Sequence, residues 1–328
     1  MSDEHDRFTA ETARHRRELR AYCYRMVGSA NDAEDLVQET YLRAWRSYGG
    51  FERRSSIRSW LYRIATNVCL TALEGRRLRV LPSGLAGPST ADRPPTDVAD
   101  EAWIEPLPDT WFAPVVEDPA GIVIARESLR LALIASLQYL PARQRAILIL
   151  REMLSFSADE TADMLDTTTA AVKSGLQRAR ARLDETTPDR EALLEPTDPR
   201  ARELLAGYVA AFERSDAALL VEVLRADARL EATPFRDWQS GRAGCIHLLA
   251  TYVLGTPGDW KMSATSANGQ PAAIVHRRDA DGTLRANGVV VLSATATGVA
   301  RVVAFHHDRA LLAPFGDHTQ GVTAAFFV

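Results

Sequence analysis

The sequence predicts a multidomain chain in which two all-α segments are followed by a C-terminal α+β domain. A length of 328 residues is enough for two or three domains with cores of their own. Charge is divided along the chain: residues 1–80 hold 15 basic and 11 acidic side chains, whereas residues 81–125 hold one and eight. From about residue 200, helical spacing gives way to strand-like runs separated by turn signals. An acidic segment therefore separates the two helical segments.

Composition limits the classes of function. No apolar run approaches the ~18 residues of a membrane helix, and the polar, acidic N-terminus does not resemble a secretory signal. The three cysteines are isolated in sequence and form neither a disulfide framework nor a zinc ligand set, which fits a reducing cytosol. We therefore expect a cytoplasmic protein with no metal, no cofactor and no membrane partner. Because a freestanding duplex-binding protein is usually more basic than a chain of net charge −4, any DNA binding here requires a larger partner.

The first helical segment contains two helices before residue 50. One is expected over residues 8–27, ending near Gly28, and the next starts at Asn31 or Asp32. The second helix has one apolar stripe and one acidic and amide stripe. The acidic and amide stripe consists of Asp32, Asp35, Gln38 and Glu39. Such a ridge is either a solvated face or a docking surface for a basic partner.

The next helix mixes aromatic and basic residues. Gly49 and Gly50 end the preceding helix, and the loop FERRSS leads into IRSWLYRIATNVCLTALEGRRLR. Aromatic and basic side chains together suit single-stranded DNA, because bases stack on rings while cations follow the phosphates. The alternative is that the aromatic residues belong to the core, and we favour that role for Trp60.

Residues 142–183 predict two helices joined by a tight turn to a basic helix. Ser157 is expected to cap the short helix with Glu160 in a capping box. Asp166 suits the turn because Asp tolerates left-handed backbone angles, and Thr168 or Thr169 can cap the next helix. The apolar positions of that helix recur at helical spacing and should face inward. They are Val172, Leu176, Ala179 and Leu183.

The opposite side of this last helix carries basic and amide side chains. They are Lys173, Ser174, Gln177, Arg178, Arg180 and Arg182. A helix that buries one stripe and exposes such residues on the other suits insertion into the DNA major groove. The alternative is an ordinary amphipathic helix with a solvated charged face.

These motifs, in this order, resemble the sigma-70 family. DAEDLVQETYLRAW and SWLYRIATNVCL make residues 9–79 similar to its region 2, and LPARQRAILILREM followed by AAVKSGLQRARARL makes residues 126–185 similar to its region 4. No region 3 lies between them, which resembles the extracytoplasmic-function (ECF) class. The resemblance implies RNA polymerase core and promoter DNA as partners, a role in initiating transcription, and no catalysis.

The resemblance also implies roles for residues. The polymerase-docking face is Asp32, Asp35, Gln38 and Glu39. The reader of the melted −10 element is Phe51, Ser55, Arg58, Trp60, Arg63 and Asn67. The reader of the −35 element is Thr169, Ala170, Lys173, Ser174, Gln177 and Arg178. Where the family often has Arg in this last helix the chain has Gly175, so we expect a lost phosphate contact and weak −35 affinity.

Between the two regions, residues 81–125 are Pro-rich and acidic, which argues against regular structure. Four of its side chains, Trp103, Ile104, Trp111 and Phe112, are unusual for a passive linker, because apolar side chains seek burial. We expect them to dock on a folded domain of this chain.

The C-terminal part predicts an α+β domain. Helices are expected at about 200–214, 216–226 and 243–254, with strands in ARLEAT, KMSATSA, AAIVHRR, LRANGVVVLSAT and VARVVAFHH. ADARLEATPFRDWQSGR, ANGQPAAIV and RVVAFHH resemble the SnoaL-like cone shared with ketosteroid isomerase. The expected domains are region 2 at 1–80, region 4 at 126–186 and the SnoaL-like domain at 200–328. The linkers between them are 81–125 and 187–199.

A cone fold encloses a pocket in the mouth of its curved sheet. The candidate pocket residues are Asp227, Trp238, His276 and His306, with Glu231, His247, Asn268 and His307 as further candidates. Asp227 and His306 fit a general-base pair; adjacent His306 and His307 must point to opposite faces of a strand. Catalysis, sensing of an unknown small ligand, and protein docking remain open. We favour docking, with intramolecular contacts to regions 2 and 4 that regulate activity in cis.

Two other functions remain as alternatives. One is a freestanding helix-turn-helix regulator, which leaves residues 9–79 unexplained. The other is a cyclase- or isomerase-type enzyme fused to a DNA-binding module.

Overall fold

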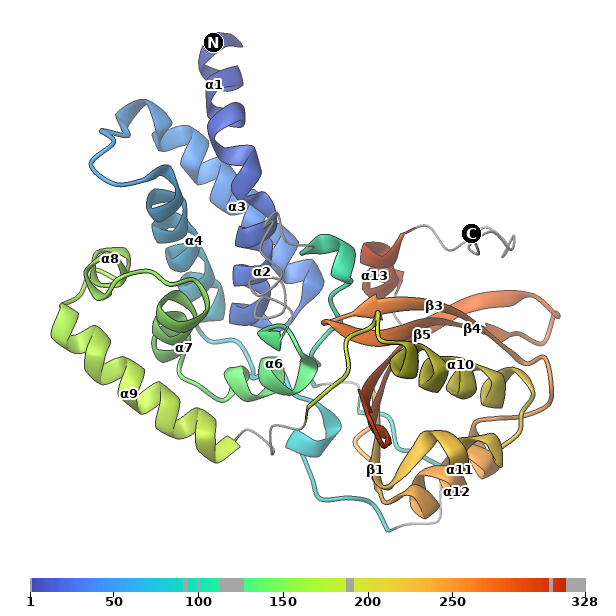
Figure 1. Ribbon diagram of the computed structural model, residues 1–328. Helices are drawn as coiled ribbons and strands as arrows, with labels where there is room; N and C mark the ends of the chain where they lie inside the picture. The colour runs from blue at the N-terminus through green and yellow to red at the C-terminus, as the bar shows by residue number, and fades with distance from the viewer. Residues whose placement is uncertain are drawn as a thin grey trace. The chain divides into compact units, whose positions relative to one another are not determined.

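The computed structural model describes residues 2–90, 94–98, 101–112, 127–186, 192–306 and 309–316. The chain forms two compact units, a helical unit of Met1–Arg79 with Asp109–Arg190 and a sheet unit of Val80–Pro108 with Glu191–Val328 (Figure 1). The acidic segment is thus divided: its first part belongs to the sheet unit, and Asp109 onward belongs to the helical unit. Within the described ranges, no helix is long and apolar enough to cross a membrane.

The helical unit holds both helical segments of the sequence. Its helices are α1 (Ser2–Thr12), α2 (Arg16–Val27), α3 (Ala30–Ser47), α4 (Ile57–Leu73), α6 (Leu131–Gln138), α7 (Ala142–Leu148) with the π-helical turn η5 (Ile149–Met153), α8 (Ala158–Met164) and α9 (Thr169–Thr186). The single helix expected over 8–27 is wrong, because a 3₁₀ turn at Ala13–His15 divides it. Helix α3 begins earlier than expected because the side chain of Ser29, which accepts from the amide of Asp32, is its cap.

The core of the first helical segment lies between α2, α3 and α4. Tyr22 and Tyr62 are fully buried there, and the Tyr22 hydroxyl lies 2.8 Å from Oγ1 of Thr66. Cys23 and Cys69 are isolated in sequence but adjacent in the fold, with 3.7 Å between their sulfur atoms. The hydrogen bond that Cys23 shares with Cys69, together with burial, raises the pKa of Cys23, so the thiol stays protonated.

The sheet unit has six strands in the order β2-β1-β6-β5-β4-β3, with β1 parallel to β6 and all other pairs antiparallel. Its elements are α10 (Pro199–Glu213), α11 (Leu219–Val223), β1 (Leu224–Thr233), β2 (Gln239–Ser240), α12 (Arg242–Tyr252), β3 (Trp260–Ala267), β4 (Gln270–Arg278), β5 (Leu284–Thr295), β6 (Gly298–His306) and α13 (Arg309–Leu312). The expected α+β class is confirmed. The helix expected over 216–226 is shorter, because the chain enters β1 at Leu224. Asn268 and Gly269 both have positive φ and close the β3–β4 hairpin.

Helices α10 and α12 cover one face of the sheet (Figure 1). Alternating strand residues such as Leu230, Val290 and Val302 join the apolar core on that face. Glu231 belongs to the opposite face of β1, where it is fully buried and accepts from Nε of Arg301 at 2.6 Å. The amide of Ser83 donates to the same carboxylate at 2.9 Å.

The four apolar residues of the acidic segment dock on folded parts of the chain, as expected. Ile104 is fully buried in the sheet unit, and the neighbouring Leu107 exchanges two hydrogen bonds of 2.8 Å with Asn268. Trp103 is half-buried and pairs with Val80. In the helical unit, Phe112 is buried and the Trp111 ring lies 4.4 Å beneath the guanidinium of Arg20. The linker residues 91–93, 99–100, 113–126 and 187–191 lie outside the described residues.

Candidate nucleic-acid interface

The predicted helix-turn-helix is present in α8 and α9. Ser157 and Glu160 form the capping box, with bonds of 3.1 and 2.8 Å. Asp166 has the left-handed φ of 48° that the turn requires, and Oγ1 of Thr168 accepts from the amide of Ala171. The expected inner stripe is confirmed: Val172, Ala179 and Leu183 are buried and Leu176 is half-buried.

The predicted reading side chains lie on the other side of α9. Ala170, Lys173, Ser174, Gln177 and Arg178 are exposed, and Thr169 is half-buried because its hydroxyl donates to Asp159 at 2.9 Å. Of the other basic residues, Arg180 pairs with Glu152 of η5.

Gly175 does not lie on this exposed face, so its interpretation as a lost phosphate contact is wrong. It is buried, and a Cβ at this position would lie 2.6 Å from Cδ1 of Ile147 in α7. The glycine therefore permits close packing of α9 on α7. The sequence did carry a signal for this role, because Gly175 falls on the apolar side of the helical spacing pattern of α9.

Two of the four predicted docking residues on α3 already form ion pairs within the helical unit. Asp35 and Gln38 are exposed. Glu39 pairs with Arg43 at 2.6 Å. Asp32 pairs with Arg76 and Arg79 at 2.7 and 2.9 Å. Helical spacing does not reveal these ion pairs, because the two arginines lie at the far end of the first helical segment.

The predicted −10 residues lie around the start of α4. Ser55, Arg63 and Asn67 are exposed. Phe51 stacks on Trp60 with ring centroids 4.7 Å apart and an interplanar angle of 27°. Both rings are half-buried, so Trp60 is not the core residue that we favoured.

Arg58 is already engaged inside the helical unit. Its guanidinium pairs with Glu18, donates to the carbonyl of Leu154 at 3.3 Å and lies 4.2 Å from the ring of Phe156. Burial raises the pKa of Glu18, but hydrogen bonds from His15 and Arg58 outweigh it and lower that pKa to about 2. Sequence reasoning missed these contacts because Leu154 is 96 residues from Arg58.

These contacts are part of a packing of α8 against α4. The Ser59 hydroxyl donates to Glu160 at 3.1 Å, and the rings of Tyr62 and Phe156 are 5.0 Å apart. Deeper in the unit, the buried Arg145 of α7 donates to the carbonyl of Met26 in α2 and to Gln138. The two helical segments therefore share one interior in this structure.

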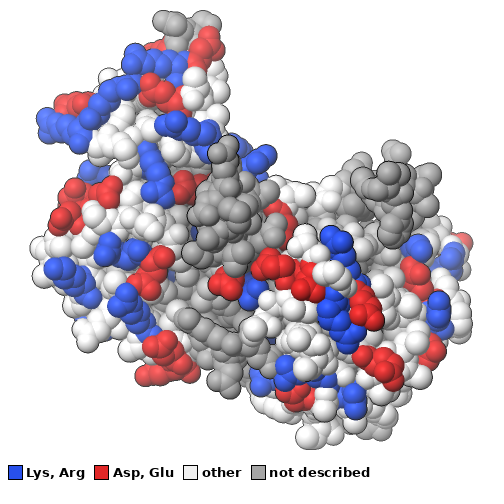
Figure 2. All heavy atoms as spheres, viewed as in Figure 1, with Lys and Arg blue, Asp and Glu red and all other residues white. Residues whose placement is uncertain are grey.

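Basic and acidic side chains are interspersed over the face shown in Figure 2, and no single basic surface emerges there. This agrees with the mixed charge of residues 1–80, which hold 15 basic and 11 acidic side chains. Among the described residues, no group of His, Cys, Asp and Glu is placed to hold a metal ion.

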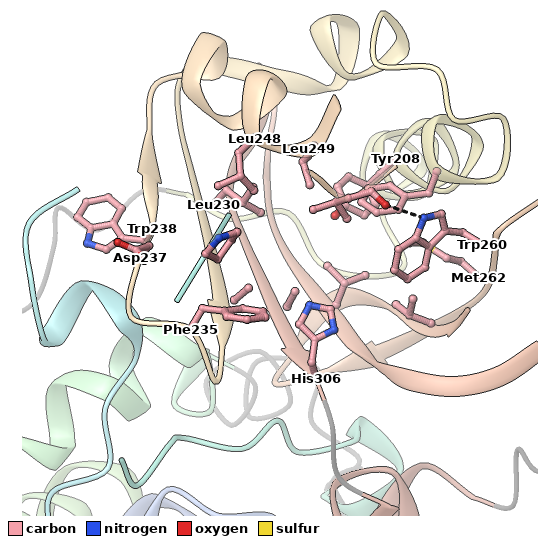
Figure 3. Close-up of a pocket in the computed structure, with 17 residues that line it drawn as sticks. Tyr208, Leu230, Phe235, Asp237, Trp238, Leu248, Leu249, Trp260, Met262 and His306 are labelled. Atoms are coloured by element: carbon pink, nitrogen blue, oxygen red, sulfur yellow. Dashed lines mark hydrogen bonds between the residues drawn. The ribbon is translucent and has the colours of Figure 1, made fainter. Parts of the chain in front are cut away.

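The sheet unit contains a pocket between α10, α12 and the sheet (Figure 3). Of the predicted pocket residues, Trp238 and His306 line it. Asp227 does not: its side chain is 68% exposed and pairs with Arg225 at 2.7 Å. His276 does not either, because it follows Val275, which faces the pocket, on the same strand.

The other candidates also lie away from the pocket lining. Glu231 and Asn268 make the contacts described above, His247 is exposed on α12, and His307 lies outside the described residues. The lining instead includes Tyr208, Phe235 and Trp260, which the sequence analysis did not select. Apolar residues of this kind carry no signal that separates pocket from core.

The chain is similar to known sigma factors along most of its length. Family models match Sigma-70 region 2 over residues 12–79 and Sigma-70 region 4 over residues 130–183. The ECF RNA polymerase sigma factor SigG of Mycobacterium tuberculosis is 48% identical over 314 residues, covering 94% of this chain and 83% of the relative. SigM of the same organism is 32% identical over 170 residues, covering 52% of this chain and 71% of the relative.

Among solved structures, the extracytoplasmic function sigma factor SigJ of Mycobacterium tuberculosis matches with a TM-score of 0.56 and 21% identity. The match covers 91% of this chain and 96% of that one, a likeness of fold. The helix-turn-helix, the two family models and the extensive identity to SigG lead to one assignment. The chain belongs to the ECF RNA polymerase sigma factors of the sigma-70 family and carries a C-terminal SnoaL-like domain.

Proposed function

We propose that this sigma factor binds the polymerase core through the exposed part of the α3 face and reads promoters through α4 and α9, in a cytoplasmic setting and without catalysis of its own. The observation that carries this proposal is the outer face of α9, where Lys173, Gln177 and Arg178 are exposed opposite an inner stripe that is buried except for the half-buried Leu176. Amide and guanidinium groups recognise base edges in the major groove. The enzyme alternative loses its general-base pair, since Asp227 lies outside the pocket that His306 lines.

The docking assignment is tested at Asp35, which is exposed on α3. Asp35→Arg reverses one charge at the centre of the proposed surface and should abolish co-elution with the polymerase core while leaving the circular dichroism spectrum unchanged. Glu222→Arg makes the same reversal at an exposed site of α11 and should retain binding. Retained binding by Asp35→Arg would remove α3 from the interface.

The promoter assignment is tested by transcription in vitro with core polymerase and a library of −35 sequences. Gln177→Ala should relax base preference, whereas Lys173→Ala should weaken all promoters alike and lower the salt slope by about one. Arg202→Ala, at an exposed site of α10, is the matched control. Unchanged base preference in Gln177→Ala, or unchanged promoter strength and salt slope in Lys173→Ala, would contradict the assignment.

We further propose that the helical unit, as the structure has it, is a closed resting state. The −10 and −35 elements are about 25 base pairs apart, on the order of 85 Å at ~3.4 Å per base pair of B-form DNA. Region 2 and region 4 cannot bridge that span while Ser59 and Glu160 are 3.1 Å apart. Promoter recognition therefore requires α8 to leave α4, which also releases Arg58 from its contacts with Leu154 and Phe156.

Opening can be followed by a distance measurement between spin labels at Thr71→Cys and Ala181→Cys, two exposed positions on α4 and α9. The native cysteines are all buried, so labelling is selective. The distance should increase by tens of ångströms when polymerase core and promoter are added together. An unchanged distance in an active complex would eliminate the closed-state proposal.

Regulation in cis by the SnoaL-like domain is part of the same proposal. It is supported by the acidic segment, since residues between the two reading regions dock in the sheet unit. Truncation after Glu185 removes that docking partner and should raise transcription from a given promoter. Unchanged or lower activity would exclude simple inhibition.

A further inference from the structure

The pocket of the sheet unit has walls that are almost entirely apolar. Tyr208 and Trp260 lie on one side and Phe235 and His306 on the other (Figure 3). The cavity measures about 70 Å³, and about 650 Å³ when its crevices and open mouth are included. By the first measure it holds several water-sized groups, since one water needs about 10–15 Å³.

One wall of this pocket comes from outside the cone. Pro95, from the acidic segment between regions 2 and 4, lines the cavity. Its neighbours are fixed by backbone hydrogen bonds: Thr96 donates to Asp237 at 3.0 Å and accepts from the amide of Arg236 at 3.2 Å, and Val98 donates to Pro234 at 3.0 Å. We call the described residues 86–90 and 94–98 the strap.

The strap is also bonded to a second pocket residue. The indole of Trp238 donates to the carbonyl of Ala86 at 2.8 Å, and the amide of Ser89 donates to the carbonyl of Trp238 at 2.7 Å. The strap therefore contributes Pro95 to the pocket wall and is hydrogen-bonded to a second wall residue, Trp238. Any molecule that packs against them adds to the stability of the docked strap.

The lining also restricts the chemistry of the ligand. Among the residues that the structure describes, the lining includes no Lys or Arg, and its charged member is the carboxylate of Asp237, so an anion bound among these residues would stay unpaired at a high cost. The other polar groups are the Tyr208 hydroxyl, His306, which is 3.0 Å from Asn287, and the indole N–H groups of Trp238 and Trp260, which donate to backbone carbonyls. Burial raises the pKa of Tyr208 above its usual range, which keeps the hydroxyl neutral.

We propose that this pocket binds a small, neutral, largely aromatic or alicyclic molecule bearing one polar group, and that its binding is coupled to docking of the strap. By reciprocity, a ligand that binds better when the strap is docked strengthens strap docking by the same factor. The consequence for transcription rests on the proposed cis regulation, because the strap belongs to the segment between regions 2 and 4. Binding and strap protection are measurable without polymerase.

The test uses the full-length protein and two probes of nearly equal shape, 2-naphthol and the anion 2-naphthoate. Ligand-observed NMR should show 2-naphthol binding at least tenfold more tightly than 2-naphthoate. Ala304→Leu fills the cavity and should reduce 2-naphthol affinity at least tenfold, and Ala232→Leu repeats the test from another strand. Ala250→Leu, at an exposed site of α12, is the control.

Coupling is read by hydrogen exchange. Saturating 2-naphthol should slow exchange at the amides of Ser89, Thr96 and Val98 severalfold, while the amide of Leu107, which bonds to Asn268 away from the strap, should not change. Equal binding of the two probes, or binding that survives both filling variants, overturns the ligand site. Binding without a change in strap exchange overturns the coupling. Neither failure touches the polymerase and promoter assignments, which the Asp35 and Lys173 variants test separately.

Discussion

The recognition helix α9 and the pocket of the sheet unit differ in how far apart in sequence their parts lie. Both faces of α9 come from one helix of 18 residues. The pocket combines α10, α12, several strands and Pro95 of the strap, which is 113 residues from Tyr208. Local spacing therefore determines the first site, whereas strand register and a distant segment determine the second.

Two carboxylates on β1 show the same contrast within one strand. Glu231 is fully buried, whereas the side chain of Asp227 is 68% exposed. The pairing of β1 with β6 shifts register between Leu224 and Arg229, so Asp227 lies in the irregular part and Glu231 in the regular part. Residue type alone therefore does not predict whether a strand residue is buried or belongs to a site, because the strand register must also be known.

Glu231→Gln is expected to have the largest effect, because it leaves the charge of Arg301, whose side chain is 14% exposed, without its partner. Breaking a buried pair on one side costs about 3–5 kcal/mol. Amide hydrogen exchange of β1 and β6 measures this loss. Asp227→Asn, which breaks an exposed pair on the same strand, should change stability by less than about 0.5 kcal/mol. Equal effects of the two variants would refute the contrast.

Gly175→Val tests whether the inner face of α9 is as closely packed as the structure has it. The new Cβ would meet Cδ1 of Ile147 at 2.6 Å, and overpacking of this kind costs about 1–3 kcal/mol. The loss should appear as faster hydrogen exchange in α7 and α9. In an Ile147→Ala background the same substitution should cost clearly less, since the space is then available. An identical cost in both backgrounds would place the strain elsewhere.

Acid should weaken the contact between α4 and its neighbours through Glu18. The pKa of Glu18 is about 2 in the folded protein against an ordinary value of 4.5. A lowered folded-state pKa stabilises the protein fully above about pH 4.5, and that stabilisation is lost as the pH falls towards 2. After allowance for the 35% exposure of the side chain, the contribution is on the order of 1–2 kcal/mol. Glu18→Gln should flatten this part of the stability profile, and Glu52→Gln, at an exposed site, should not.

The sequence predicted most of what depends on local rules. The inner stripe of α9, the left-handed Asp166 and the capping box were all expected and are present. Contacts between distant segments were not foreseen, such as Arg58 with Leu154. The burial of Ile104 was expected, because an apolar side chain in an acidic, Pro-rich segment seeks burial. The part of the chain on which it docks was not foreseen.

A smaller effect than for Glu231, Gly175 or Glu18 is expected for Ser157→Ala, at the start of α8. The hydroxyl accepts from the amide of Glu160, and its loss leaves one amide at the end of a seven-residue helix without a bond. Substitution of a capping residue by Ala costs about 0.5–2 kcal/mol. Because the carboxylate of Glu160 also accepts from Ser59, the change should loosen α8 from α4 as well, and hydrogen exchange at Thr161 and Leu165 should report it. Ser157→Asp retains an acceptor at the cap and should keep near-native protection. If Ser157→Ala leaves both amides as protected as before, packing rather than the cap holds α8, and local rules then explain less of the helix-turn-helix than its sequence signature indicates.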